Sequence, residues 1–385
     1  MTVGFLRETA PNERRVAMVP AQVPSLTRAG CDVVMEPGCG DPAGYPDSLF
    51  AERGVRVLES AEQVLKEADA ILCVRAARAA DGEDPGHGIA CRLRERQIII
   101  GFLDPYAPHD SFRCLVERKV TAFSMELMPR ITRAQSMDPL SSMASLAGYK
   151  AVLVAAEALP RMFPMMMTAA GTVVPVRVLV IGAGVAGLQA VATARRLGGV
   201  VSAYDVRPEV KEQVTSLGAR FVEMELDTHG SEGQGGYARQ MDDQFYRKQR
   251  DLMSYVVSES DVVITTASVP GKRAPVLLTR EMVEQMRPGS VIVDLAAERG
   301  GNCELAQPGK TISHNGVSVL GPVNLAGELP FTASQLYARN IATYFLSMVK
   351  EGEFAPDTDD EIVAATLITR NGEIPNETVR AALEL

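Results

Sequence analysis

The 385-residue chain has no tryptophan, and its few cysteines and histidines are scattered. The six cysteines form no CxxC motif, and the four histidines, His87, His109, His229 and His314, lie far apart in the sequence. Zinc sites and disulfide frameworks are recognised by closely and regularly spaced residues of these types. The sequence therefore predicts no bound metal and indicates no disulfide framework.

The chain also lacks an excess of positive charge. Its formal net charge is -9 and its pI is near 5.2, and the lysines and arginines form no basic cluster. A protein that binds nucleic acid needs a basic face to neutralise phosphates. We therefore expect no nucleic-acid partner, and an acidic surface also disfavours binding to anionic lipid.

A third absence is a hydrophobic run long enough to span a membrane. The longest uncharged run, Val178 to Ala194, is interrupted by three glycines, and it is short for a bilayer core of ~30 Å. The N-terminal stretch MTVGFLRETAPNERR contains no apolar signal core. We expect no membrane insertion and no export, which together predict a cytoplasmic location.

The length and the hydrophobic pattern predict an α/β protein with two domains, because 385 residues exceed one ordinary core. Short apolar runs alternate with helical patterns in TVGFL, CDVVMEP and DAILCV, and again in VRVLVIG, VVSAYD, DVVITTA and SVIVDLA. This rhythm is typical of parallel, doubly wound sheets. We predict two Rossmann-like domains: residues 145–325 bind a nucleotide, and residues 1–135 together with 328–385 form the other.

The segment VRVLVIGAGVAGLQA has the spacing of a dinucleotide-binding turn. Gly182, Gly184 and Gly187 follow an apolar strand and precede a helix, with Ala183 and Val185 among them. The first glycine permits a tight turn, the second lets backbone approach a pyrophosphate, and the third lets helix and strand pack closely. The alternative is an ordinary glycine-rich turn.

An acidic residue downstream favours the nucleotide-binding interpretation. Asp205 ends the next predicted strand, VVSAYD, where a carboxylate accepts hydrogen bonds from an adenosine ribose. A carboxylate there also repels a 2′-phosphate, so we predict NAD(H) rather than NADP(H). Val206 and Arg207 follow, and Arg207 is the contrary sign because it could pair with that phosphate. Thr266 and Ala267 end DVVITTA at the same sheet edge, where we expect contact with adenine or ribose.

Two polar segments interrupt this pattern. The stretch PRITRAQSMDPLSS places two arginines, a glutamine, an aspartate and four hydroxyl side chains between two apolar segments. Residue types alone leave a solvated interdomain loop as one interpretation. Pro139 within it biases Asp138 toward extended backbone. The insertion from Asp227 to Arg250 has four glycines near its middle and is interpreted as a lid, with an unrelated surface loop as the alternative.

Several segments, together with the glycine motif, resemble the NAD(H)-binding domain I, or alpha subunit, of proton-translocating transhydrogenase. They are MELMPRITRAQSMDPLSSMASLAGYKAV, SAYDVRPEVKEQVTSLG, GGYARQM and PGSVIVDLAAERGGN. The resemblance implies that NAD(H) binds in the interdomain cleft on the second domain. It implies that Arg130, Gln135, Asp138 and Ser141 hold the nicotinamide end. It also implies that Gly236, Tyr237 and Ala238 form the tip of a mobile loop.

The same resemblance implies partners. NADP(H) and the proton channel would lie on membrane-spanning and NADP(H)-binding subunits, with this chain peripheral to the inner membrane and assembled as a homodimer. Hydride would pass between NADH and NADP⁺. Transfer between two nicotinamides moves no substrate proton, so it needs positioning rather than an acid/base pair.

Alanine dehydrogenase belongs to the same fold family and is the rival interpretation. Arg15 matches its substrate arginine, but its catalytic lysine falls near Cys73, its histidine near Leu103 or Asp104, and its aspartate at Glu298. Amine oxidation needs a general acid/base, so amino-acid oxidation is disfavoured. A non-catalytic protein that senses NAD(H) is the third interpretation.

Overall fold

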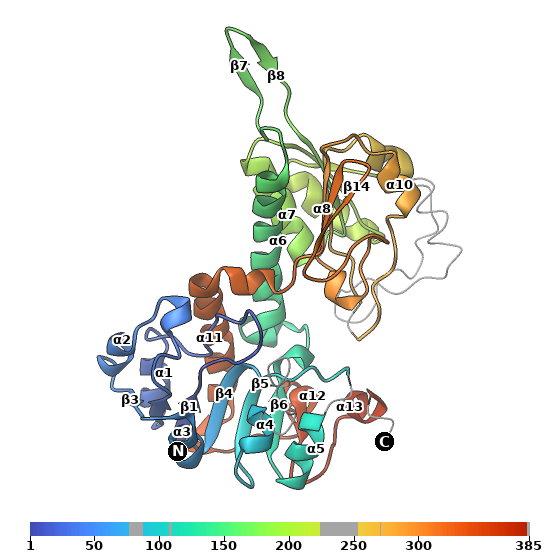
Figure 1. Ribbon diagram of the computed structural model, residues 1–385. Helices are drawn as coiled ribbons and strands as arrows, with labels where there is room; N and C mark the ends of the chain where they lie inside the picture. Colours follow the sequence, from blue (N-terminus) through green and yellow to red (C-terminus); the bar gives the residue numbers. More distant parts are fainter. Residues whose placement is uncertain (77–87, 108–109, 224–252, 270, 383–385) are drawn as a thin grey trace. The chain divides into compact units, whose positions relative to one another are not determined.

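The computed structural model describes residues 1–76, 88–107, 110–223, 253–269 and 271–382 (Figure 1). It divides into two compact units. Unit 1 comprises Met1–Met143 and Ala326–Leu385, and unit 2 comprises Ala144–Leu325. The boundary falls inside helix α6 (Pro139–Ala158), so residues 136–143 belong to unit 1. The predicted α/β class with two domains is confirmed.

Unit 1 contains a seven-stranded sheet that is parallel except for its edge strand β18, which pairs antiparallel with β6. Its strands are, in sheet order, β18 (Leu367–Thr369), β6 (Thr121–Ser124), β5 (Ile98–Phe102), β4 (Ala70–Arg75), β1 (Thr2–Phe5), β2 (Asp32–Met35) and β3 (Arg56–Val57). The inner strands are continuous apolar runs, as β4 shows with five buried residues. Such runs are typical of parallel strands covered on both faces.

The helices and helical turns of unit 1 are α1 (Val23–Arg28), η1 (Asp41–Ala43), α2 (Asp47–Ala51), α3 (Ala61–Glu67), α4 (Ile89–Arg92), α5 (Asp110–Glu117), η3 (Met125–Leu127), η4 (Thr132–Met137), η8 (Leu325–Glu328), α11 (Pro330–Ser347), α12 (Glu361–Thr366) and α13 (Glu377–Ala382). A small hairpin joins β16 (Val349–Lys350) to β17 (Glu353–Phe354). Residues after α11 therefore complete unit 1, since β18 extends its sheet. The buried Tyr344 on α11 hydrogen-bonds Thr366 on α12.

A disulfide joins Cys91 on α4 to Cys114 on α5. The sequence indicated no disulfide framework, and for this pair that interpretation was wrong. The two cysteines are 23 residues apart, and packing of α4 against α5, rather than local spacing, brings them together. The other cysteines, Cys31, Cys39, Cys73 and Cys303, are buried thiols.

Unit 2 contains a second seven-stranded sheet, parallel except for its edge strand β14, which pairs antiparallel with β15. Its strands are, in sheet order, β11 (Arg220–Phe221), β10 (Val200–Tyr204), β9 (Arg177–Ile181), β12 (Val262–Thr265), β13 (Val291–Asp294), β15 (Val317–Leu320) and β14 (Thr311–His314). Its helices are α7 (Val185–Arg196), η5 (Pro208–Val210), α8 (Lys211–Ser216), α10 (Arg280–Glu284), η7 (Ala297–Arg299) and most of α6.

In both sheets the first three strands run outward in one direction and the chain then crosses to the far side of the first strand. This is the order of a doubly wound fold, whose ligands bind where the strand order reverses. In unit 2 the reversal lies between β9 and β12, which pair in parallel through Val262 to Thr265.

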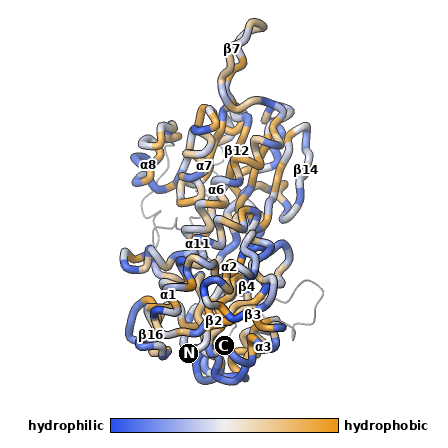
Figure 2. Tube along the Cα trace, turned by 90° about the vertical axis from the view of Figure 1, so that its left-hand side faces the viewer, coloured by the Kyte–Doolittle hydropathy of each residue, from blue (hydrophilic) through white to orange (hydrophobic). Residues whose placement is uncertain are grey.

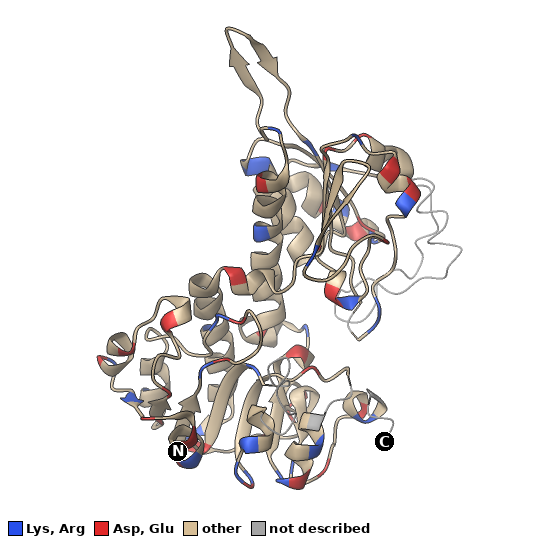
Figure 3. Cartoon of the chain, in the orientation of Figure 1, with Lys and Arg blue, Asp and Glu red and all other residues tan. Residues whose placement is uncertain are grey.

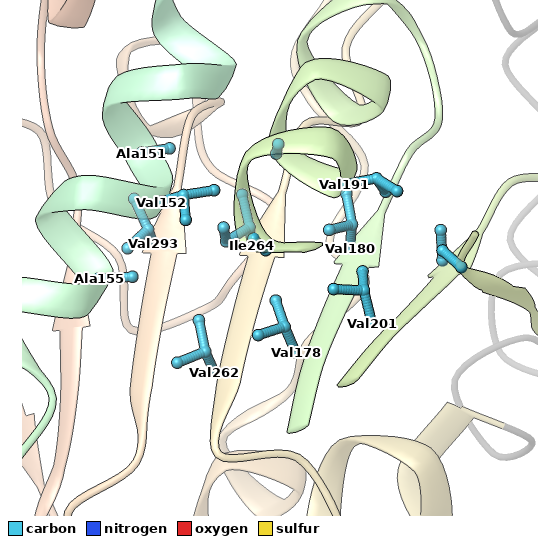
Figure 4. Close-up of a cluster of buried hydrophobic side chains, with 14 of the residues drawn as sticks. Ala151, Val152, Ala155, Val178, Val180, Val191, Val201, Val262, Ile264 and Val293 are labelled. Carbon is cyan, nitrogen blue, oxygen red and sulfur yellow. The ribbon is translucent and has the colours of Figure 1, made fainter. Parts of the chain in front are cut away.

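The core of unit 2 lies on both faces of its sheet. On one face, Val178, Val180, Val262 and Ile264 pack with residues of α6 and α7 (Figure 4). Alternate residues of the same strands, among them Leu179 and Val263, pack with α10 on the other face. This alternation follows from the two-residue period of a strand. In Figure 2 the hydrophobic stretches of β12 and its neighbours run through the interior of the unit.

A hairpin of β7 (Met166–Thr168) and β8 (Gly171–Val173) extends from unit 2 (Figure 1). It carries no charged residue (Figure 3), and every residue of both strands is exposed. Just before the hairpin, Phe163 is 5% exposed and belongs to the core of unit 2, whereas Met165, Met166 and Met167 are exposed. Core packing, which a run of methionines favours, is therefore the wrong interpretation of Pro164 to Met167. Within the described ranges, every helix is too short or too polar to cross a bilayer.

Candidate functional site

The predicted phosphate-binding turn joins β9 to α7 in unit 2. Gly182 has φ +96°, a backbone conformation that L side chains rarely adopt. A Cβ on Gly187 would lie 1.8 Å from the carbonyl oxygen of Gly182, so only hydrogen permits this approach of helix and strand. A Cβ on Gly184 would meet nothing within 4 Å. The turn is therefore tight at its two outer glycines and open at the middle one.

The open side of the turn suits an anion. Gly184 caps α7, and the helix begins at Val185 without any side-chain cap. The first amides of a helix have no partners within it, and the helix dipole favours negative charge there. Space beside Gly184 and uncapped amides together fit a pyrophosphate.

Asp205 follows β10 and is tied to the turn. Its Oδ2 accepts hydrogen bonds from the amide of Ala183 at 2.7 Å and from a terminal guanidinium nitrogen of Arg207 at 2.8 Å. Its Oδ1 accepts bonds from the amide and the Nε of Arg207, both at 2.9 Å. Val206 between them packs partly buried against the core. Asp205 thus joins the glycine turn to Arg207 at the end of β10.

Thr266 and Ala267 follow β12, and the neighbouring turn positions both. The Thr266 hydroxyl donates to the carbonyl of Gly182 at 2.9 Å, and its amide donates to Ile181 at 2.8 Å. The structure therefore brings Thr266, Ala267, the glycine turn and Asp205 together at one edge of the sheet, as sequence position predicted for strand ends.

Asn302 is a residue of this site that sequence reasoning missed, although it closes the quoted segment PGSVIVDLAAERGGN. It is fully buried, and its Nδ2 donates to the carbonyls of Ala267 at 2.9 Å and Pro275 at 2.8 Å. Its amide donates to Asp294 at 2.7 Å. Burial raises the pKa of Asp294 above its ordinary value. Asn302 thus fixes the segment that follows β12.

The polar loop before α6 lies in unit 1, and Asp138 is its anchor. The Asp138 Oδ1 accepts the amide of Ser141 at 3.0 Å, and its Oδ2 accepts the Ser141 hydroxyl at 2.5 Å. Asp138 thus caps α6, whose first residue is Pro139. Proline favours that position because its missing N–H would be unpaired there anyway. The predicted extended backbone of Asp138 is confirmed, with φ -85° and ψ 97°.

Two polar residues of this loop are exposed, and the loop is held on both sides of them. Gln135 lies on η4 and is exposed, as is Arg130. The Asn340 Nδ2 on α11 donates to the carbonyl of Ser136 at 2.8 Å, and Arg133 pairs with Asp360, the N-cap of α12. Gln135 therefore projects from a segment whose backbone is fixed on either side of it.

Arg15, which matches the substrate arginine of alanine dehydrogenase, is paired with a carboxylate of its own chain. Arg15 donates from Nε to Glu13 at 2.7 Å and from a terminal nitrogen at 2.6 Å. Their side chains are 5% and 0% exposed. Burial raises the pKa of Glu13, but the hydrogen bonds and charge of Arg15 outweigh it and hold the pKa below its ordinary value. Glu13 therefore holds the Arg15 guanidinium inside unit 1.

The other dehydrogenase positions do not hold the matching lysine, histidine and aspartate. Burial raises the pKa of the Cys73 thiol well above its ordinary value. Leu103 is buried, and the amides of Leu103 and Asp104 donate to Glu126 at 3.0 and 2.8 Å. Glu298 is exposed and accepts the amide of Asn324 at 3.3 Å. These positions therefore lack the lysine, histidine and aspartate that alanine dehydrogenase uses.

The remaining predicted residues, Gly236, Tyr237 and Ala238, lie outside the described residues. Their assignment to a loop that closes on the nucleotide stays a prediction.

Comparison with known proteins agrees with this geometry. Family models of alanine dehydrogenase/PNT match residues 4–147 as the N-terminal domain and residues 151–377 as the C-terminal domain. An NAD(P) transhydrogenase alpha subunit of Rhodospirillum rubrum is 43% identical over 97% of both chains. Alanine dehydrogenase of Mycolicibacterium smegmatis is 28% identical, over 100% of this chain and 97% of its own.

A solved structure titled transhydrogenase, from Sinorhizobium meliloti, is 45% identical with a TM-score of 0.86, and the match covers 97% of this chain and 100% of that one. The chain belongs to the alanine dehydrogenase/PNT family, and within it is more similar to the transhydrogenase alpha subunits than to alanine dehydrogenase.

Proposed function

We propose that this chain is the NAD(H)-binding alpha subunit of a proton-translocating transhydrogenase. It passes hydride between NADH and NADP⁺ held on a partner subunit. One observation carries the choice between the two branches of the family: Cys73, Leu103 or Asp104, and Glu298 stand where alanine dehydrogenase has its catalytic lysine, histidine and aspartate. The glycine turn and Asp205 keep a nucleotide-binding arrangement.

The residues of unit 2 fit the adenosine half of NADH. Space beside Gly184 and the amides of α7 suit the pyrophosphate. Asp205, Thr266 and Ala267 lie at the sheet edge that binds ligands in open α/β sheets. NAD(H) supplies the hydride, which leaves one nicotinamide ring as an electron pair with its proton and joins the other, so no side chain has to give or take a proton.

The polar loop of unit 1 is assigned to the nicotinamide end. An exposed glutamine offers a donor and an acceptor to a carboxamide, and Gln135 sits on a turn fixed by Asn340. Arg130, Asp138 and Ser141 complete the proposed set. Asp138 also caps α6, so its contribution is to hold the loop as much as to contact ribose. Orientation of the ring, rather than proton transfer, is what this loop supplies.

The exposed hairpin supports a homodimer. Met167 and Val174 are 75% and 74% exposed on a protrusion without charge, which is unusual for a surface in contact only with water. A second copy of the chain is the proposed occupant. Met167→Asp should convert the dimer to a monomer, and light scattering on a sizing column measures the mass of each species. A monomeric wild-type chain would rule the dimer out.

Partner subunits carry the NADP(H) site and the membrane-spanning channel, so we place the chain at the cytoplasmic membrane face. The test combines the purified chain with membranes that contain those subunits and follows hydride exchange between NADPH and an oxidised NAD⁺ analogue. Exchange should require both components. Oxidation of L-alanine by NAD⁺ with this chain alone would overturn the proposal, and NADH binding without exchange would identify a sensor instead.

A pair of variants separates the two halves of the proposed site. Asp205→Ala should weaken NADH binding, whereas Gln135→Asn should slow hydride exchange more than it weakens binding. The chain has no tryptophan, so NADH emission can be followed with little protein background. Equal effects of both variants on affinity would contradict this division of roles.

A further inference from the structure

The Asp205–Arg207 pair lies at the position proposed above for the adenosine ribose. Three hydrogen bonds join the two residues, and a fourth joins Asp205 to Ala183. These four donors engage both oxygens of the Asp205 carboxylate. The side chains of Arg207 and Asp205 are 11% and 4% exposed.

An arginine at this place has a second chemical meaning. Where a Rossmann fold binds NADP(H), an arginine near the ribose accommodates the 2′-phosphate. Guanidinium matches the geometry of phosphate with two parallel hydrogen bonds. Arg207 has the right group two residues beyond the ribose carboxylate, but the carboxylate engages both its Nε and a terminal nitrogen.

We propose that Arg207 is a latent 2′-phosphate-binding residue that Asp205 holds out of use. Asp205 then selects NAD(H) in two ways: its charge repels the phosphate, and its oxygens occupy the cation that would otherwise bind it. This inference rests on the proposed nucleotide site. It assigns the selectivity to a pair of residues rather than to the carboxylate alone.

The experiment measures NADH and NADPH affinities by nucleotide fluorescence at one salt concentration. The proteins are wild type, Asp205→Ala, Arg207→Ala and the double variant. Asp205→Ala should lose at least tenfold in NADH affinity and gain at least tenfold in NADPH affinity. The double variant should lose the gain and bind both nucleotides weakly. Asp205→Asn, which keeps the shape of the side chain, repeats the test if the alanine variant folds poorly.

A matched control lies at the opposite end of the same sheet. Arg161 pairs with Asp261 at 2.6 Å, just before β12 begins. Arg161→Ala, added to Asp205→Ala, should leave the NADPH gain intact, whereas a loss equal to that from Arg207→Ala would reduce the effect to net charge and overturn the proposal.

Two further results would overturn it: no gain in NADPH affinity for Asp205→Ala or Asp205→Asn, or a gain that persists in the double variant. The second would show that removal of repulsion suffices. Failure of the proposed nucleotide site is distinguishable, because wild-type protein would then bind no NADH, and failure of the proposed transhydrogenase reaction is distinguishable because NADH would bind without hydride exchange.

Discussion

Each unit buries an arginine against a carboxylate two residues earlier in the sequence, and the two pairs differ in their surroundings. Glu13 holds Arg15 in unit 1, and Asp205 holds Arg207 in unit 2. Both arginines donate two side-chain hydrogen bonds to their partner. The local chemistry is therefore nearly the same.

The neighbours decide what each pair can do. Around Arg15 lie Phe102, with its ring centre 6.0 Å from the guanidinium carbon, and the buried Glu8. Beside Asp205 lies the glycine turn, with open space at Gly184. An arginine–carboxylate pair that side chains enclose thus contributes to stability alone. The same pair can also select between nucleotides where the backbone beside it leaves space for a ligand.

The largest effect should come from adding side chains to the glycine turn. Gly187→Val would place a side chain against the Gly182 carbonyl, where even a Cβ comes within 1.8 Å, and should cost more than ~4 kcal/mol of unfolding free energy. Gly184→Ala meets no atom within 4 Å, so its stability should stay within ~1 kcal/mol of wild type while NADH affinity falls at least tenfold. Chemical denaturation and NADH titration measure the two quantities.

The two variants compare an added side chain at the open glycine with one at the closely packed glycine. If Gly184→Ala binds NADH as wild type does, the turn is an ordinary connection between strand and helix. If it loses stability as severely as Gly187→Val, the space beside Gly184 is not open in solution.

The next effect should come from unit 1. Glu13→Ala removes the carboxylate that pairs with the buried Arg15, and breaking a buried pair typically costs ~3–5 kcal/mol. NADH affinity should not change, because this pair is enclosed within unit 1. Glu67→Ala is the control, since its pair with Arg56 is exposed and such pairs contribute ~1 kcal/mol or less. A fall in NADH affinity for Glu13→Ala would show that the two pairs are not separate in function.

The residues that follow simple chain-local rules were predictable. Glycine spacing identified the turn because only glycine adopts the φ of Gly182 or permits the approach at Gly187. Alternating apolar runs identified the strands, and Asp205 was found because a parallel strand ends at the ligand edge. Pro139 also agrees with its rule once it is seen as the first residue of α6.

What escaped the sequence depends on contacts between distant residues or on the direction of a long side chain. Asn302 bonds Ala267 across 35 positions, and Cys91 reaches Cys114 because two helices pack together. Arg207 was weighed as a phosphate partner, but nothing in its position told which way its guanidinium turns. Sequence pattern predicts the strands, helices and turns, whereas these side-chain contacts form only once the chain has folded.

The buried Glu8 beside the unit 1 pair should make stability depend on pH. Burial, above all, raises its pKa to about 7, so the folded state keeps a proton that the unfolded chain releases near pH 4.5. The stabilisation is therefore complete at lower pH and is lost as the pH rises toward 7, by up to ~3 kcal/mol. Glu8→Gln mimics the protonated form and should flatten this part of the profile. A constant difference between the two proteins from about pH 5 to 8 would refute it.

The smallest effects should come from two buried asparagines that hold the two proposed halves of the site. Asn302→Ala leaves the carbonyls of Ala267 and Pro275 without their donor, and Asn340→Ala does the same to Ser136. Each variant should cost ~1–3 kcal/mol of unfolding free energy. Because Asn302 supports the adenosine side, its variant should weaken NADH binding several-fold.

Because Asn340 supports the turn that carries Gln135, its variant should slow hydride exchange while NADH affinity stays near wild type. Titration and exchange rate, measured on both proteins at a temperature where both are folded, separate the outcomes. If Asn340→Ala weakens NADH binding as much as Asn302→Ala does, the polar loop contributes to affinity, and the division between a unit that binds and a loop that orients has to be abandoned.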